Sequence, residues 1–311
     1  MGPTACGKTA LAESIAQRFP VEVISVDSAL IYRQMNIGTA KPDAEFLARL
    51  PHHLIDIRDP DQRYSAADFR RDALPLMADI TARGHIPLLV GGTMLYFKVL
   101  LEGIAELPPA DAAIRQQILS DAEQLGWQAM HQRLAAVDPS TAAALHPNHS
   151  QRIQRALEVY YSSGETLSSH QARQQLEALP YRVAQLALWP AERSELHARI
   201  AQRFDQMLQQ GLVDELRGLR QNFDLHPDMP SMRSVGYRQS WDFIERRISE
   251  QQLREQGVAA TRQLAKRQLT WLRKWPHLHR LSANFDQDQA ESDWLEISLQ
   301  KISKLLQELS G

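Results

Sequence analysis

The sequence predicts an α/β protein with a parallel β-sheet and a helical insertion. Strand and helix patterns alternate over roughly the first hundred residues, which is typical of parallel sheets covered by helices on both faces. From residue 111 to residue 178 only helical patterns follow, and then strand character returns. We therefore expect a sheet core with C-terminal helices over 1–107 and 181–311, and a helical insertion domain over 108–180.

The expected elements can be placed from their end signals. The helix expected over 65–84 starts after Ser65, a good N-cap followed three residues later by an acid, and closes at Gly84, with Pro75 able to kink it. We expect Tyr160, Tyr161 and Trp241 in the core. The predicted elements outside the insertion are, in order, a helix over 8–19, a strand over 21–27, a short strand over 52–57, a helix over 65–84, a strand over 86–90, a helix after the turn at 91–93, a strand over 183–189 and a final amphipathic helix over 294–309.

The composition is that of an ordinary globular protein. The net charge of −2 over 311 residues provides no bulk attraction to nucleic acid, so such binding would need local patches. Cys6 is the only cysteine, which excludes an internal disulfide. No run approaches the roughly 18 apolar residues of a membrane span, and no leader pattern precedes residue 2. We expect a soluble cytoplasmic protein that does not associate with membranes.

The stretch MGPTACGKT carries a phosphate-loop pattern. Gly2, Gly7, Lys8 and Thr9 fit G-x-x-x-x-G-K-[ST] at full spacing. In such a loop, backbone N–H groups and a helix N-terminus converge on an anion, the lysine adds charge, and the hydroxyl can ligate Mg²⁺. The alternative is a glycine-rich turn before a helix. The pattern favours a P-loop NTPase-like core, in which a small-molecule kinase is one candidate activity.

Asp27 is the candidate catalytic carboxylate. It closes a predicted strand, and the carboxyl ends of parallel strands share one edge of a sheet, so it should face the same crevice as Lys8 and Thr9. There it could act as a general base or as an indirect Mg²⁺ ligand. Alternatively, it could simply cap the segment that follows. The turn at 91–93 should lie at the same edge, either beside a ligand or only as a tight connection.

Basic residues concentrate in three segments. The segment 260–280 contains six of them and no acid, and on a helix Arg262, Lys266 and Arg273 fall near one face. Such a face can follow a phosphate backbone, although a solvated helix is the alternative. Three separated segments suit a large polyanion better than a small ligand. The remaining basic residues are Arg267, Lys274 and Arg280, then Arg233 and Arg238, and finally Arg152 and Arg155. The histidines lack the spacing of a zinc site.

Eight segments, in order along the chain from residue 2 to about residue 275, together resemble the bacterial tRNA dimethylallyltransferases, of the tRNA isopentenyltransferase family. Any one of them is modest evidence, whereas eight in order are highly specific, and they cover most of the chain. The segments are GPTACGKT, ISVDSALIYRQMNIGTAKP, HHLIDIRDP, YSAADF, PLLVGGTMLYFKVLLEG, QRIQRALEV, RSVGYRQ and ATRQLAKRQLTWLR.

The resemblance implies prenyl transfer rather than phosphoryl transfer. Family members move a dimethylallyl group from dimethylallyl diphosphate to N6 of adenosine 37 in tRNA, releasing diphosphate, with Mg²⁺ as cofactor. By this resemblance Asp27 takes a proton from the N6 amine, and Thr9 helps to hold Mg²⁺. Lys8 and Arg233 complete the implied catalytic set, with Arg238 as the alternative to Arg233. The implied diphosphate-binding residues are Gly2, Pro3, Thr4, Ala5, Cys6, Gly7, Lys8 and Thr9.

The resemblance also implies a tRNA-binding surface. The helical insertion would clamp the anticodon stem-loop, whose splayed bases suit recognition and base flipping. We expect the enzyme to act as a monomer. The implied tRNA contacts are Asp27, Ser28, Ala29, Leu30, Thr93, Arg115, Gln151, Arg152, Ile153, Gln154, Arg155, Arg233, Ser234, Val235, Gly236, Tyr237, Arg238, Lys266, Arg267, Gln268, Leu269, Thr270, Trp271, Leu272 and Arg273.

One departure from the family concerns the start of the loop. Family members carry a hydrophobic strand just before it, and here the loop begins at Gly2. We expect the first strand of the sheet to be missing, through a downstream start or truncation, and stability to suffer. Cys6, where the family often has serine, should be tolerated because the backbone binds the anion. Three other activities stay open at this point: a kinase, an isopentenyltransferase of free adenine nucleotides, and a non-catalytic RNA-binding protein.

Overall fold

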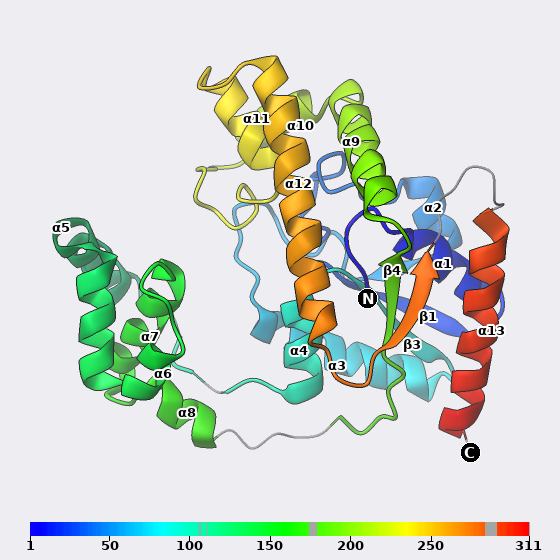
Figure 1. Ribbon diagram of the computed structural model, residues 1–311, viewed down its shortest axis with the longest axis horizontal. Coiled ribbons are helices and arrows are strands. Elements are labelled where there is room, and N and C mark those ends of the chain that lie inside the picture. Colours follow the sequence, from blue (N-terminus) through cyan, green and yellow to red (C-terminus); the bar gives the residue numbers. More distant parts are fainter. Residues whose placement is uncertain (106, 110, 174–178, 284–290, 311) are drawn as a thin grey trace. The chain divides into compact units, whose positions relative to one another are not determined.

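A computed structural model of the chain describes residues 1–105, 107–109, 111–173, 179–283 and 291–310. The chain divides into two compact units: Met1–Leu101 with Leu179–Gly311, and Glu102–Ala178 (Figure 1). The first unit combines parallel strands with many helices, which confirms the predicted α/β class at this level. Within the described residues, no helix is both long enough and apolar enough to cross a membrane.

Parallel strands form two sheets in the first unit. In one, the order is β2–β1–β3, and β1 pairs with β3 from Val21 opposite Ile86 to Val26 opposite Gly91. In the other, β4 pairs with β5. Because β1 and β3 run parallel, the loops that follow them leave the same edge of the sheet. The strands are β1 (Val21–Val26), β2 (His52–His53), β3 (Ile86–Gly91), β4 (Leu186–Pro190) and β5 (His279–Ala283).

Met1 extends the second sheet by one residue. Its amino group donates to the carbonyl of Leu186 (2.8 Å), and its carbonyl accepts from the N–H of Leu188 (3.0 Å). A cavity of about 220 Å³ is lined by Met1 and by apolar residues of β3 and β4. The described residues therefore place the start of the phosphate loop directly beside β4.

Helices surround these sheets and supply most of the first unit's core. In Figure 1, the whole length of the long helix α12 is visible from the side, and α9 and α11 lie close to one of its ends. The helices of this unit are α1 (Lys8–Ala16), α2 (Ala44–Arg49), α3 (Ala66–Ala82), α4 (Met94–Glu102), α9 (Arg193–Gln209), α10 (Leu212–Asn222), α11 (Tyr237–Ile244), α12 (Glu250–Arg273) and α13 (Glu291–Ser310).

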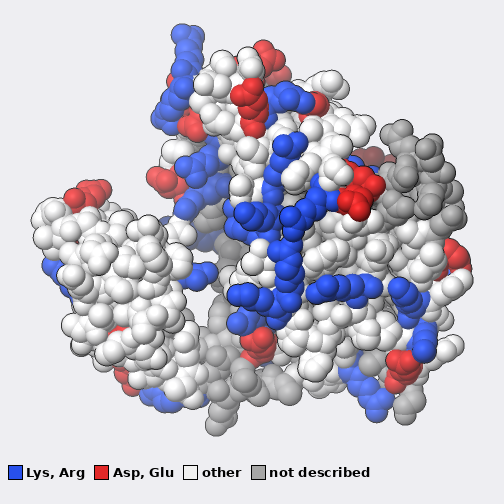
Figure 2. Space-filling model, in the orientation of Figure 1, with Lys and Arg blue, Asp and Glu red and all other residues white. Residues whose placement is uncertain are grey.

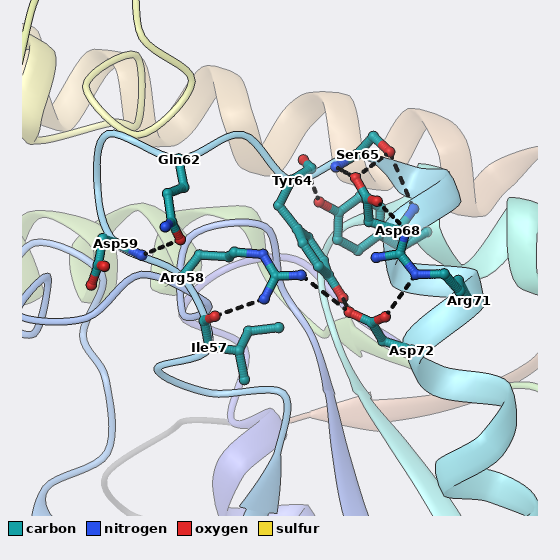
Figure 3. Close-up of polar contacts among 10 residues, drawn as sticks. Ile57, Arg58, Asp59, Gln62, Tyr64, Ser65, Asp68, Arg71 and Asp72 are labelled. Carbon is teal, nitrogen blue, oxygen red and sulfur yellow. Dashed lines mark hydrogen bonds and ion pairs between the residues drawn. The ribbon is translucent and has the colours of Figure 1, made fainter. Parts of the chain in front are cut away.

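The start of α3 is capped as predicted. Ser65 Oγ accepts from the N–H of Asp68 (3.1 Å), and the Asp68 carboxylate accepts from the N–H of Ser65 (2.9 Å), which forms a capping box (Figure 3). Just before it, the Tyr64 hydroxyl donates to Asp72 (3.1 Å), and the guanidinium of Arg58 lies over the Tyr64 ring (Figure 3). These contacts fix the chain's path into α3.

The helical unit has its own apolar core. Gly126 interrupts α5 with a φ of 80°, a backbone that glycine adopts at low cost. Ile118, Met130, Leu134 and Ile153 pack together in its interior. The helices are α5 (Ala112–Val137), α6 (Pro139–Ala143), α7 (Ser150–Ser163) and α8 (Leu167–Arg173).

Three expectations differ from the structure. The strand expected over 52–57 ends at His53, because Leu54 and Asp56 have φ of 63° and 55°, which no extended strand allows. Strand β5 was not predicted, since its short sequence HRLSA lies in a segment read as helical. Tyr161, expected in the core, is 47% exposed, whereas Trp241 is buried as predicted.

Glu22 on β1 is the centre of an ion-pair network whose strength should depend on pH. Its carboxylate accepts from Arg83 (2.7 Å) and contacts His85 (2.8 Å) and His53 (3.1 Å). Chiefly through the Arg83 hydrogen bond, the network lowers the pKa of the Glu22 carboxyl from 4.5 to about 2. Because the folded pKa is depressed, the stabilisation is complete above pH 4.5 and is lost as pH falls toward 2.

Glu22→Gln should therefore destabilise the protein at pH 7 by about 1 kcal/mol, since the pairs are partly exposed. The difference from wild type should shrink as pH falls from 4.5 to 2. Urea unfolding at several pH values measures it. Glu45→Gln is the control, because Glu45 pairs with Arg49 at the surface and is 85% exposed. A pH-independent difference would contradict the assignment.

Candidate active site

A cavity of about 900 Å³ opens where β1 and β3 end. Its lining includes Thr4–Thr9 of the phosphate loop, Asp27 and Ser28 after β1, and the turn Gly91–Thr93 after β3. Residues of α9, α12 and the segment before α11 complete the wall. The expected meeting of the loop, Asp27 and the Gly-Gly-Thr turn at one sheet edge is thus what the structure has.

The phosphate loop contains two left-handed residues, and two cationic side chains donate to its carbonyls. Ala5 and Gly7 have φ of 62° and 82°, and helix α1 begins directly after Gly7. Lys8 Nζ donates to the carbonyl of Pro3 (2.7 Å), and Arg199 Nε donates to the carbonyl of Ala5 (3.1 Å). With carbonyls engaged on these side chains, the loop's N–H groups and the N-terminus of α1 are the natural anion donors.

Asp27 performs the capping role that was its alternative reading. Its Oδ1 accepts from the N–H groups of Ala29 (2.9 Å) and Leu30 (3.4 Å). These bonds use one carboxylate oxygen, and the side chain also lines the cavity with Lys8 and Thr9. Capping and a chemical role are therefore compatible, because the cap fixes the direction of the carboxylate.

The turns after β1 and β3 are joined to each other. Thr93 Oγ1 accepts from the N–H of Ser28 (3.0 Å), and the Thr93 N–H donates to the carbonyl of Val26 (3.2 Å). Gly91 must be glycine, because a Cβ there would overlap the backbone of Val26. This close approach puts Thr93 beside Asp27, as the sequence suggested.

The cavity carries strong positive charge in a chain whose net charge is −2. Its described lining includes five lysine or arginine residues and a single acid, Asp27. Arg203 is half-buried; burial lowers the pKa of its guanidinium, and the carboxylate of Asp27 opposes that shift. A multiply charged anion would offset the crowding of these cations. The five are Lys8, Arg199, Arg203, Arg233 and Arg267.

Arg199 and Arg203 were missed from the sequence. They lie four residues apart on α9, on a face whose neighbours Ile200 and Phe204 are buried. The sequence does contain a signal for them: two arginines four residues apart, each followed by a hydrophobic residue. On a helix this spacing predicts that both guanidinium groups lie next to the core. The same helix gives the cavity an apolar wall, made of Ile200, Phe204 and Met207, with Leu264 and Trp271 from α12.

Helix α12 carries the basic face predicted from its sequence. Figure 2 shows lysine and arginine side chains in a stripe over this helix. Lys266, Arg267 and Arg273 are exposed, and so are Thr270 and Trp271, while Arg267 and Trp271 also line the cavity. Three residues of α12 expected to contact tRNA are instead buried: Gln268, Leu269 and Leu272.

The segment before α11 also divides into exposed and buried positions. Arg233, Ser234 and Val235 line the cavity, whereas the lining does not include Arg238, which is exposed at the start of α11. Gly236 and Tyr237 are buried, and the Tyr237 hydroxyl donates to Glu215. The geometry thus favours Arg233 over Arg238 as the arginine that reaches a bound anion.

In the helical unit, a buried carboxylate holds two of the expected tRNA contacts. Glu158 is 1% exposed and pairs with Arg115 (3.1 Å) and Arg155 (3.4 Å). Gln151 and Arg152 are exposed at the start of α7, and Gln154 is half-buried. Ile153 is buried in the unit's core, so its side chain packs rather than contacts a partner.

No group of three or more histidine, cysteine or acidic side chains able to hold a metal occurs among the described residues. Thr9 and Asp27 nevertheless line one cavity with the phosphate loop. That donor set fits Mg²⁺, which is commonly bound through one or two carboxylates together with water and substrate phosphates.

The family of the chain follows from comparisons with known proteins. A family described as IPP transferase matches residues 30–275. A tRNA dimethylallyltransferase of Thiobacillus denitrificans is 62% identical over 276 residues, 89% of this chain and 88% of that protein. The crystal structure of a Bacillus halodurans tRNA isopentenylpyrophosphate transferase has a TM-score of 0.68 at 35% identity, covering 97% of this chain and 95% of that one.

A eukaryotic dimethylallyltransferase acting on tRNA has a TM-score of 0.80 at 27% identity, covering 97% of this chain and 78% of that chain. The family match covers well over half of the chain, and the curated relative is matched over most of its length. The chain therefore belongs to the IPP transferase family.

Proposed function

We propose that this protein transfers a dimethylallyl group from dimethylallyl diphosphate to N6 of adenosine 37 in tRNA, giving N6-(dimethylallyl)adenosine and diphosphate. The observation that carries the proposal is one cavity with a cationic phosphate loop, a single carboxylate and an apolar wall. The names of the curated and structural relatives support it. A kinase would not need the apolar wall, and an enzyme of free nucleotides would not need the basic face of α12.

The chemistry divides between the two sides of the cavity. N6 attacks the first carbon of the dimethylallyl group, the carbon–oxygen bond to diphosphate breaks, and the proton leaves N6 for Asp27. Lys8, Arg203, Arg233 and the loop N–H groups stabilise the negative charge that develops on diphosphate. The apolar wall at Phe204 accommodates the hydrocarbon and keeps water from the reacting carbon.

Mg²⁺ is the proposed cofactor. Thr9 would hold it, directly or through water, beside the phosphate loop. When bound, the ion neutralises charge on the departing diphosphate.

The finer architecture belongs to the same proposal. The first unit is a P-loop NTPase-like core whose loop binds prenyl diphosphate in place of a nucleotide. The helical unit is a clamp for the anticodon stem-loop. Exposed cations of α12, together with Arg152 of α7, would contact phosphates of the tRNA. Monomeric action in the cytoplasm completes the proposal.

Labelled dimethylallyl diphosphate, Mg²⁺ and unmodified tRNA with adenosine at position 37 test the activity. We expect label at N6 of that adenosine, and none when free adenine nucleotides replace the tRNA. Phosphate transfer from γ-labelled ATP would support the kinase instead. Tight tRNA binding by the folded chain without turnover would leave only the RNA-binding alternative.

A further inference from the structure

Gln268 of α12 connects the two loops that form the floor of the cavity. Its Oε1 accepts from the N–H of Thr4 (2.9 Å), and its Nε2 donates to the carbonyl of Gly92 (2.9 Å). Gln268 is 8% exposed, so it is not accessible to a polyanion bound at the surface. We propose that Gln268 is a positioning residue that sets the geometry of the diphosphate loop; this inference rests on the proposed function of that loop.

The amide is the group that this position requires. Thr4 offers a donor and Gly92 an acceptor, and a primary amide has one oxygen that accepts and one nitrogen that donates. A carboxylate would still accept from Thr4 but would face the Gly92 carbonyl with lone pairs. A thioether of similar length would satisfy neither group, leaving two polar backbone atoms without their partner.

Gly92 shows that the backbone is shaped around this side chain. A Cβ at Gly92 would overlap Gln268 Nε2, so only glycine lets the amide approach the carbonyl. The same Cβ would lie 3.4 Å from the carbonyl of Gly2, which places the start of the phosphate loop against the turn after β3. Gln268 therefore connects the loop and the turn at the point where they meet.

The bond to Thr4 also determines which N–H groups of the loop remain to bind the anion. Because the N–H of Thr4 points to Gln268, it is not directed at the bound anion, and the later N–H groups of the loop are left for diphosphate. Loss of the bond would let the loop's first residues shift and would misplace those donors. Small displacements of preorganised donors are costly in catalysis.

The test compares Gln268→Glu with Gln263→Glu. Gln263 is exposed on the same helix, so the control has the same change of charge without the two hydrogen bonds. We measure the affinity for inorganic diphosphate with Mg²⁺ by calorimetry, the KM for dimethylallyl diphosphate, kcat, the affinity for an anticodon stem-loop, and thermal unfolding. Gln268→Met retains bulk without charge and covers the case in which a buried carboxylate unfolds the protein.

We expect Gln268→Glu and Gln268→Met to weaken inorganic diphosphate binding and to raise the KM for dimethylallyl diphosphate by about tenfold or more. Stem-loop affinity should match that of Gln263→Glu. Unchanged diphosphate affinity in a folded Gln268→Met would overturn the inference, as would a loss confined to stem-loop binding. If wild type binds diphosphate but transfers no prenyl group, the proposed function fails while the positioning role is still measured.

Discussion

Asp27→Asn should lower the rate of prenyl transfer by about 10²–10⁴-fold while the protein remains folded. The substitution separates the two roles of this side chain. Asparagine retains an Oδ1 that can accept from the N–H groups of Ala29 and Leu30, so the local turn should persist. It cannot take a proton from the N6 amine, so the chemical step should fail.

Single-turnover assays with saturating tRNA and dimethylallyl diphosphate measure this effect directly. Asp27→Ala is the companion variant, because it removes both the base and the cap. It should be as slow as Asp27→Asn and less stable by about 1 kcal/mol. Stem-loop affinity should remain near wild type in both variants. An Asp27→Asn enzyme with near wild-type turnover would assign Asp27 to capping alone.

What the sequence could predict was mostly local. The start of α1 at Lys8, the Ser65 cap and the strand that ends before Asp27 each depend on a few neighbouring residues whose physical roles are specific. The common edge of Asp27, Thr93 and the loop also followed, because parallel strands send their following loops to one side. Such inferences need no knowledge of how distant segments pack.

The parts that could not be predicted depend on packing between distant segments. Gln268 looked like one polar residue in a basic helix, and only the fold places it against Thr4, which is 264 residues away. Arg203 reaches the cavity because α9 buries its neighbours Ile200 and Phe204. Strand β5 exists through pairing with β4, and its sequence alone has little strand character.

The charge of the site follows from the same long-range packing. A net charge of −2 gave no bulk attraction to anions, yet five cations from four parts of the chain line one cavity. Only Arg199 and Arg203, on α9, come from a segment outside the phosphate loop and the basic segments of the sequence. Local concentration of charge, rather than net charge, is therefore what would attract an anion to this cavity.

Arg203→Ala should reduce kcat/KM for dimethylallyl diphosphate by about 10²–10³-fold, the usual cost of removing one preorganised donor to a developing negative charge. The guanidinium is half-buried beside Asp27, where water screens it less than at the surface. Its charge can therefore act strongly on diphosphate as the carbon–oxygen bond breaks. The loss should appear in kcat as well as in KM, because the charge on diphosphate grows toward the transition state.

Arg193→Ala is the matched control, since Arg193 is exposed at the first turn of the same helix. It removes the same charge from α9 and should leave kcat/KM within about twofold of wild type, because exposed charges are well screened. Arg203→Lys should recover part of the lost activity, as a lysine supplies charge without the planar fork of donors. Equal losses in Arg203→Ala and Arg193→Ala would mean that only the overall charge of α9 matters. A loss in Arg203→Ala that exceeds the control and is partly restored by lysine would assign the guanidinium to the diphosphate itself.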